Sequence, residues 1–230
     1  MKKVAILQSN YIPWKGYFDL INQVDEFIIY DDVQYTKRDW RNRNKIQTPQ
    51  GLKWVSIPVE VKGKYFQKIN ETKISDKNWP KNHWYAIKQN YLNAKYFKDY
   101  KAIFEDLYLN CEDQYLSQIN YKFIVEINKI LGINTNIRWS EEFDLISGQT
   151  DKLLGICNEC NADIYLSGPA AKNYLDESIF TSSNIKIEWM DYNNYPEYRQ
   201  LSSPFEHSVT ILDLIFNEGD SATKFMDSFN

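Results

Sequence analysis

The sequence predicts an α/β fold with a mostly parallel sheet, flanking helices and a mainly helical insertion around residues 79–131. Two observations predict this fold. Short apolar runs alternate with helical spacing in the first and last thirds of the chain, which favours βαβ crossovers. Between them lies a stretch with helical periodicity alone. At 230 residues the chain is long enough for one well-buried domain and short for two, so we expect a single domain over residues 1–230.

The N-terminal part predicts a strand, a helix and a second strand. Residues 3–8 (KVAILQ) form a short apolar run that suits a buried strand. Residues 14–24 place apolar side chains at helical spacing, and Pro13 stands where a helix begins, because its fixed φ suits the first turn. The run EFIIYDDV at 26–33 predicts the second strand, which completes a βαβ crossover.

The same patterns predict the remaining elements. Residues 34–75 predict short strands joined by turns, with a turn at Thr48–Gly51 and strands within 40–47, 51–61 and 67–74. Helices are expected at 79–93, 96–109 and 113–131, the last ended by Gly132. The last third predicts strands at 133–140, 163–168 and 185–192, and helices at 150–160, from 169, at 210–217 and at 220–228.

Composition and charge exclude several classes of protein. The net charge of −4 argues against a non-specific nucleic-acid binder, which needs a strongly basic surface. No stretch approaches the roughly 20 apolar residues of a membrane helix, and the apolar run at the N-terminus breaks after Leu7, too early for a signal peptide. The cysteines number three, an odd count that argues against a disulfide framework. We therefore expect a cytoplasmic protein without a membrane span or a nucleic-acid partner.

Polar side chains gather where the predicted strands end. In parallel α/β sheets, ligands bind at the carboxyl ends of the strands. Those ends carry the clusters Gln8–Asn10, Asp31–Gln34, Ser167–Gly168 and Trp189–Tyr192. The sequence therefore predicts one shared site, with the substrate-binding residues Gln8, Asn10, Tyr11, Asp31, Gln34, Ser167 and Gly168.

The loop SNYIPWKGYF, residues 9–18, has two interpretations. As a binding loop it would present free N–H groups at a helix N-terminus, with Lys15 adding a charge and Gly16 allowing close approach of an anion. Trp14 and Tyr17 would then also contact the substrate. As a purely structural segment it is a proline-started helix whose aromatic side chains fill the core.

The segment YDDVQYTKRDWRNRNK, residues 30–45, is a second candidate. Asp31 and Asp32 end an apolar strand and would serve as a metal site or as a general base; because adjacent strand residues point to opposite faces, we expect one of them to act. Arg41 and Arg43 share a face on a strand, beside Trp40, in the pattern of a phosphate- or nucleotide-binding surface that includes Asn42. The alternative is a solvated charge run.

His83 is the best general acid–base candidate, because histidine titrates near neutral pH. On the helix 79–93 it aligns with Ile87 and Tyr91, so a hydrogen-bonded structural histidine is the alternative. His207, in a loop, is read as structural or exposed.

Two further motifs carry residues with potential chemistry. Cys157 and Cys160 form a C-x-x-C at the end of a predicted helix, without a second pair, so core packing is favoured over zinc binding or redox chemistry. In YLSGPAAKNYL, Ser167 is expected to cap a helix while backbone N–H groups face the shared crevice. No resident metal is expected.

Several long motifs in order resemble the WbqC-like family over essentially the whole chain. They are QSNYIPWKGYFDLI, DEFIIYDDVQYTKRDWRNRNKI, the NHW around His83, YLSGPAAKNYL and FEHSVTILDLIFNEG. This family occurs in gene clusters for bacterial surface polysaccharides such as O-antigen, and a glycine transferase role has been suggested for it. The resemblance implies an enzyme of that pathway.

A more distant resemblance concerns the first loop. NYIPWKGYFDLI looks like the start of the nucleotidylyltransferase superfamily, which implies a Rossmann-like sheet. The superfamily's H-x-G-H histidines fall on Trp14 and Tyr17, with Gly16 kept. Some members use ATP to make an acyl-adenylate and then an amide. Without the histidines, either Lys15, Arg41 and Arg43 stabilise phosphates, or the acyl donor arrives already activated and ATP is not needed.

Together these observations give two functional hypotheses. The first is an acyl or aminoacyl transferase that forms an amide on a nucleotide-linked amino sugar, with ATP or another activated acyl donor. Here Lys15, Arg41 and Arg43 hold phosphates, Asp32 or His83 deprotonates the amine, and N–H groups near Ser167 stabilise the oxyanion. The second is a non-catalytic nucleotide- or sugar-binding protein of the same pathway.

Overall fold

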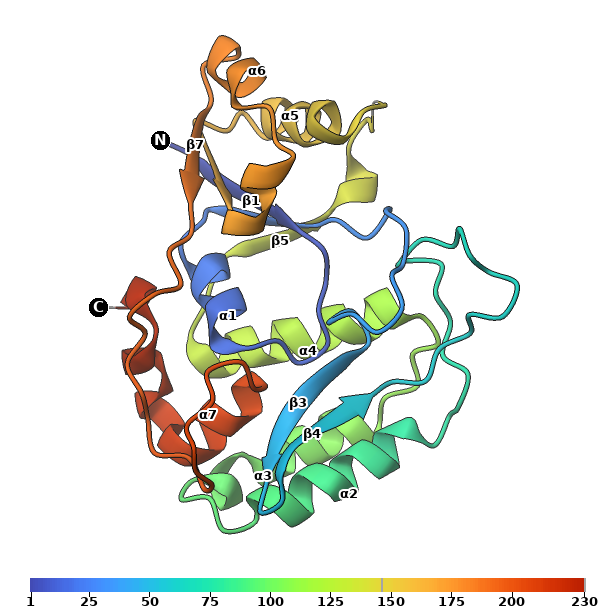
Figure 1. Ribbon diagram of the computed structural model, residues 1–230, viewed down its shortest axis with the longest axis vertical. Coiled ribbons are helices and arrows are strands. Elements are labelled where there is room, and N and C mark those ends of the chain that lie inside the picture. Colours follow the sequence, from blue (N-terminus) through green and yellow to red (C-terminus); the bar gives the residue numbers. More distant parts are fainter. Residues whose placement is uncertain (146, 230) are drawn as a thin grey trace.

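Five parallel strands form the central sheet of the computed structural model, which describes residues 1–145 and 147–229 (Figure 1). The strands are β1 (Lys3–Leu7), β2 (Glu26–Ile29), β5 (Asn136–Trp139), β6 (Ile164–Ser167) and β7 (Lys186–Trp189). Their order is β5-β2-β1-β6-β7, so chain order reverses between β1 and β6. This confirms the predicted Rossmann-like α/β fold. A reversal of this kind is a topological switch point, where the loops after the strands diverge and leave a crevice.

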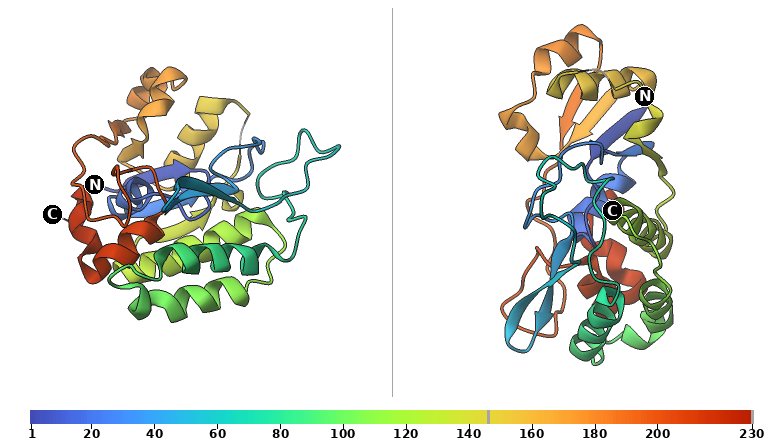
Figure 2. Two further views of the ribbon diagram at one scale, coloured as in Figure 1. Left: turned by 60° about the horizontal axis from the view of Figure 1, so that its bottom comes forward. Right: turned by 90° about the vertical axis from the view of Figure 1, so that its right-hand side faces the viewer.

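Helices cover both faces of the sheet because successive strand residues point to opposite sides. Ala5 and Phe27 pack with α1 (Lys15–Asn22) and α4 (Leu116–Leu131). Val4 and Ile28 pack with α5 (Gln149–Glu159) and α6 (Glu177–Ser182). Figures 1 and 2 show the two pairs of helices on opposite sides of the strands. The strands are apolar on both faces, as buried parallel strands must be.

The predicted helical insertion is confirmed and packs against a two-stranded hairpin. Helices α2 (Trp79–Tyr91) and α3 (Phe97–Leu109) precede α4, and each begins and ends within a few residues of its prediction. The hairpin consists of β3 (Arg43–Thr48) and β4 (Gly51–Ser56), which are antiparallel and meet at the expected turn. The C-terminal helix α7 (Ile211–Glu218) lies beside α3 (Figure 1).

Two of the expected strands were wrong in type or extent. Residues 67–74 form single bridges instead of a strand: Lys68 pairs with Gln34, Lys73 with Tyr115 and Ile74 with Val59. A segment that meets three different partners cannot form one continuous ladder. Strand β2 ends at Ile29, so Asp31–Gln34 lie in a loop.

The short helices at the chain's end and after β6 are 3₁₀ turns. They are η2 (Pro169–Asn173), η3 (Gly219–Phe225) and η4 (Asp227–Phe229); a further turn, η1 (Ser140–Glu142), follows β5. Such runs are typically short because their hydrogen-bond geometry is poorer than that of an α-helix. Gly168 occupies the N-cap of η2 without a side-chain cap, so the expected Ser167 cap is absent there. None of the helices in the described part of the chain is long and apolar enough to cross a membrane.

Candidate functional site

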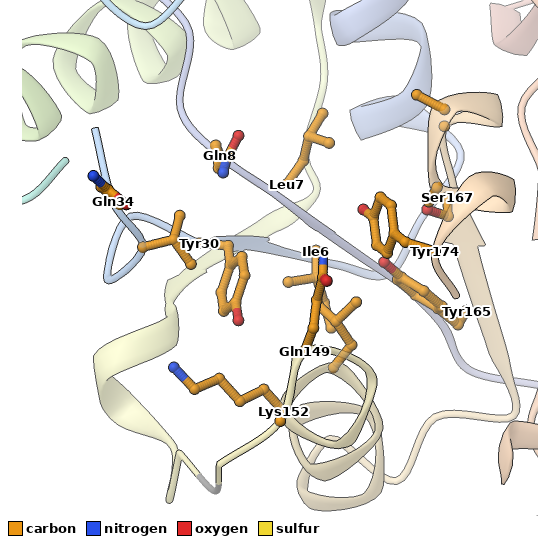
Figure 3. A pocket seen from close by; sticks show the side chains of 16 residues that line it. Ile6, Leu7, Gln8, Tyr30, Gln34, Gln149, Lys152, Tyr165, Ser167 and Tyr174 are labelled. Atoms are coloured by element: carbon orange, nitrogen blue, oxygen red, sulfur yellow. The ribbon is translucent and has the colours of Figure 1, made fainter. Parts of the chain in front are cut away.

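A cavity of about 580 Å³ opens at the switch point of the sheet (Figure 3). Its walls come from the ends of β1, β2 and β6, from η2 and from the first turn of α5. The lining residues are Ile6, Leu7, Gln8, Tyr30, Val33, Gln34, Gly148, Gln149, Lys152, Leu153, Tyr165, Ser167, Gly168, Ala170, Ala171 and Tyr174. We call it the switch-point cavity. Its location agrees with the expectation that ligands bind at the carboxyl ends of the strands.

Lys152 is the one cationic residue among these lining residues of the described chain. It lies in the first turn of α5, and Figure 3 shows its side chain extending from that helix toward the region of Tyr30. Its Nζ donates to Oδ2 of Asp32 at 3.4 Å, and Oδ1 of Asp32 accepts from the Ser140 hydroxyl at 2.8 Å. Asp32 is only 5% exposed. The lysine therefore lies between a buried carboxylate and the cavity.

The rest of the polar lining is neutral. Burial, with a smaller effect from the charge of Asp32, raises the pKa of Tyr30 to about 12. Burial also raises the pKa of Tyr165 and of Tyr174. These phenols stay protonated at neutral pH, so they can donate and accept hydrogen bonds and present apolar ring faces. With the amides of the glutamines, they suit a polar ligand that is uncharged apart from one anionic group.

Arg41 fixes the loop after β1 at the edge of this cavity. Its guanidinium donates to Oε1 of Gln8 and to Oδ1 of Asn10, and it lies 3.6 Å from Oδ2 of Asp39. The loop is also held by the Tyr17 hydroxyl, which donates to the Gln8 carbonyl at 3.0 Å. Gln8 lines the switch-point cavity, whereas Asn10 lines a smaller cavity next to it together with Trp14. Arg41 thus joins the walls of two cavities.

The two adjacent aspartates have different surroundings. Asp31 is 1% exposed and accepts from the Ser9 N–H at 2.8 Å, from the Ser9 hydroxyl at 2.6 Å and from the Ser117 hydroxyl. Burial raises its pKa, while the hydrogen bonds from Ser117 and Ser9 and the charge of Arg41 oppose that rise. Asp31 therefore ties the β1 loop to α4, and of the two acids Asp32 is the one beside the cavity.

Lys15 and Gly16 do not reach the switch-point cavity. The Lys15 ammonium donates to the Pro196 carbonyl at 2.9 Å and lies 5.0 Å from the centre of the Tyr195 ring. Burial lowers its pKa to about 8 against the raising effect of nearby acids. Gly16 lies under the Trp14 indole, because a Cβ there would be 2.3 Å from its Cζ2. The N-terminus of α1 is therefore covered by the indole of its N-cap residue, Trp14.

His83 is held in the core between two partners. Its Nε2 donates to the Ser56 carbonyl at 3.1 Å, so its Nδ1 accepts from the Tyr11 hydroxyl at 2.9 Å. The Tyr108 hydroxyl, 2.8 Å from that of Tyr11, extends the chain of hydrogen bonds. Burial lowers the pKa of His83 to about 4. These are the contacts of a structural histidine, and neither it nor Tyr11 lines the switch-point cavity.

The other predicted residues of the 30–45 segment support the hairpin. Asn42 donates to the Ile57 carbonyl at 2.8 Å. Arg43 donates to the Arg38 carbonyl, and its guanidinium lies 4.1 Å from the centre of the Trp54 ring. Of the predicted substrate-binding set, Gln8, Gln34, Ser167 and Gly168 line the switch-point cavity.

Sequence reasoning missed five polar residues of the cavity: Tyr30, Gln149, Lys152, Tyr165 and Tyr174. The signal for Lys152 was its place in the first turn of a helix that follows a strand. In βα units the helix begins at the same edge of the sheet at which the strand ends, so helix starts belong to the candidate list as well as strand ends.

The two cysteines of the C-x-x-C lie in the core, away from the lining of the switch-point cavity. Cys157 and Cys160 are buried free thiols in the α5–α6 core, as expected for packing. Burial raises the pKa of Cys160 to about 12. Within residues 1–145 and 147–229, no group of three or more histidine, cysteine, aspartate or glutamate side chains is placed to hold a metal ion.

Sequence comparison finds related proteins whose matched region includes most of the residues of this site. The sequence model of the WbqC-like protein family matches residues 8–225, a range that includes all but the first two lining residues of the switch-point cavity. A protein of Mycobacterium tuberculosis named "Uncharacterized protein Rv1507c" is 49% identical over 226 residues, which is 98% of both chains. No solved structure matches the chain.

Proposed function

The chain belongs to the WbqC-like protein family, and from this we propose that it is an acyl or aminoacyl transferase of surface polysaccharide biosynthesis. It forms an amide on a nucleotide-linked amino sugar, with glycine as one candidate acyl group. The donor is a carboxylic acid activated by ATP or supplied in another activated form. Both substrates are small molecules, and the proposed location is the cytoplasm, where nucleotide-activated precursors are made.

The Lys152–Asp32 pair at the switch-point cavity is the observation that carries this proposal. The Lys152 ammonium favours an anion at one end of the cavity. The tyrosines and glutamines supply ring faces and hydrogen bonds for a sugar at the other. A cavity with one cation in a neutral polar lining suits an amino sugar beside a phosphorylated acyl donor.

The pair also supplies the proton transfer. When the donor's phosphate binds the Lys152 ammonium, Oδ2 of Asp32 loses its hydrogen bond from that ammonium. Asp32 can then accept a proton from the sugar's ammonium or attacking amine. The amine nitrogen then attacks the acyl carbon. A C–N bond forms, the bond to the phosphate oxygen breaks, and the leaving phosphate carries away the electron pair beside Lys152.

The test is product mass. The full-length protein is incubated with ATP, glycine and a nucleotide-linked amino sugar, then with other amino acids and with preformed acyl donors. The expected product gains the mass of the donor carboxylic acid less one water. Asp32→Asn should abolish this gain while ligand binding persists, and Ser202→Ala, a change away from the cavity, should leave it unaltered. No mass gain with any donor and acceptor would contradict the enzyme proposal.

The second candidate is a non-catalytic binding protein of the same pathway. One observation favours it: the bases we expected are already partnered in the described structure, Asp32 by Ser140 and Lys152, and His83 by Ser56 and Tyr11. A rise in melting temperature with the nucleotide-linked sugar, together with no turnover in the mass assay, would select this candidate.

A further inference from the structure

The smaller cavity beside the main site collects motifs that the switch-point cavity does not use. It has a volume of about 210 Å³ and is lined by Asn10, Pro13, Trp14, Trp40, Asn44 and Ser208. We call it the tryptophan cavity. Its walls come from the loop after β1, from the segment before and within β3, and from the segment before α7, which are far apart in the chain.

We propose that the tryptophan cavity binds the planar base of the nucleotide-linked substrate. This deepens the proposed function and rests on it for the identity of the complete ligand. Two indoles and a proline ring supply flat apolar walls, and aromatic side chains bind bases by stacking on their faces. Trp40 is 37% exposed, so its ring is accessible from solvent.

The hydrogen-bonding capacity of the cavity favours a base over a sugar ring. Asn44 is already used, because its Nδ2 donates to the carbonyls of Tyr11 and Ile12 at 3.2 and 2.8 Å. The Ser208 hydroxyl donates to Glu206 at 2.6 Å. In the described contacts, Asn10 uses only its Oδ1, which leaves its Nδ2 hydrogens to donate. A pyranose has hydroxyls around its whole ring that need partners, whereas a base concentrates its polar groups at its edge.

The rim of the cavity carries positive charge. The Lys45 ammonium lies 5.7 Å from the centre of the Trp40 ring and 3.4 Å from the Ser208 hydroxyl. Arg43 lies on Trp54, the ring next to Trp40. In the part of the chain that the structure describes, neither cation has a carboxylate within ion-pair distance. The Glu206 carboxylate, which accepts from the Ser208 hydroxyl, offsets part of the Lys45 charge, whereas Arg43 has no ion pair among the described residues. Cations beside an aromatic cavity match a base joined to phosphate.

Arg41 supplies the connection between the two cavities. It contacts Gln8 in the wall of the switch-point cavity and Asn10 in the wall of the tryptophan cavity. These two residues are two positions apart, and two residues of extended chain span at most about 7 Å, so the two walls are close together. A nucleotide-linked sugar would therefore place its base against Trp40, its phosphates near Arg41, and its sugar in the switch-point cavity.

The backbone at this place is strained. Ile12 has φ of 38°, a left-handed conformation that is a genuine outlier for a β-branched residue, and Asn44 holds its carbonyl. Strain of this kind is typical of ligand sites that the surrounding structure holds in place.

Calorimetric titration of the full-length protein with UMP, CMP, AMP and GMP tests the proposal, with glucosamine and inorganic phosphate as comparison probes. At least one nucleotide should bind, and Trp40→Ala should weaken that binding by about tenfold, the loss of one stacking wall. Tyr85→Ala is the matched control, since Tyr85 is an aromatic side chain that is 63% exposed and does not line the cavity. It should change affinity by less than about threefold.

Three results would overturn the proposal: no nucleotide binding, nucleotide binding that Trp40→Ala leaves unchanged, or glucosamine binding that Trp40→Ala removes. The two proposals fail separately. If acyl transfer proceeds while the Trp40→Ala variant keeps wild-type nucleotide affinity, the base site is wrong and the transferase stands. If Trp40 governs nucleotide binding but no donor gives a mass gain, the base site stands and the transferase is wrong.

Discussion

The Nζ atom of Lys152 lies 3.4 Å from Oδ2 of Asp32, although 120 positions separate the two residues in the chain. The contact brings the first turn of α5 to the loop after β2, beside the switch-point cavity that Lys152 lines. Asp32 and an incoming anion therefore compete for one ammonium group.

That competition predicts opposite effects for the two partners. Lys152→Met should remove the rise in melting temperature that phosphate ligands give to the wild type, because the cavity loses its cation. Asp32→Asn should enlarge the rise, because the ammonium is then free of its carboxylate. Thermal melts across a phosphate titration measure both, with Lys172→Met as the control for general charge. Equal responses in all three variants would contradict a ligand role for Lys152.

Asp31 should matter for stability. Asp31→Ala would leave buried donors of Ser9 and Ser117 without an acceptor, at a cost of roughly 3 kcal/mol in the free energy of unfolding. Asp31→Asn keeps one acceptor for the Ser9 N–H and should cost less. Denaturant unfolding of both variants measures the difference. Loss of ligand binding in Asp31→Asn with unchanged stability would instead indicate a substrate contact.

Gly16 should not tolerate a side chain. The Cβ of Gly16→Ala would lie 2.3 Å from the Trp14 ring, whose other neighbours are Tyr192 at 5.1 Å and Tyr195 at 5.8 Å between ring centres. The indole must move, and we expect a loss of roughly 1–3 kcal/mol, as for other overpacked sites. Near-ultraviolet circular dichroism and denaturant unfolding detect the shift. A variant with wild-type spectrum and stability would show that Trp14 adapts freely.

His83 should make the free energy of unfolding depend on pH. Its pKa is lowered to about 4 in the folded state, so between pH 4 and 6.5 the unfolded chain binds more protons. Stability is therefore full above pH 6.5 and is lost as pH falls, by about 3 kcal/mol from this group. The adjoining Tyr11 and Tyr108 have raised pKa values and stay neutral throughout.

Unfolding at pH 4.5, 5.5 and 7 measures this effect. Glutamine at position 83 keeps hydrogen-bonding groups without the titration, so His83→Gln should flatten the contribution relative to wild type. The histidine's NMR titration gives an independent reading. An ordinary pKa near 6.5 for His83 would contradict the prediction.

Much of the fold was predictable because the local periodicity of apolar residues indicates which side chains are buried. The apolar runs of β1 and β6 and the spacing of α4 give the correct elements, and strands that alternate with helices leave a parallel sheet as the natural arrangement. The prediction of a strand at 67–74 was wrong because the bridges to Gln34, Val59 and Tyr115 depend on the paths of distant segments. Strand-like composition does not specify partners.

The location of the site could be predicted from the sequence, but only some of its lining residues could. The order of strands and loops along the chain was enough to predict that polar groups such as Gln8 and Ser167 would meet at the carboxyl edge of the sheet, because parallel strands share that edge. Which lysine faces the cavity could be seen only from the folded chain. Lys15 is held by the carbonyl of Pro196, 181 positions later, while Lys152 is held by Asp32. A long side chain takes its direction from such remote partners, and local sequence does not contain them.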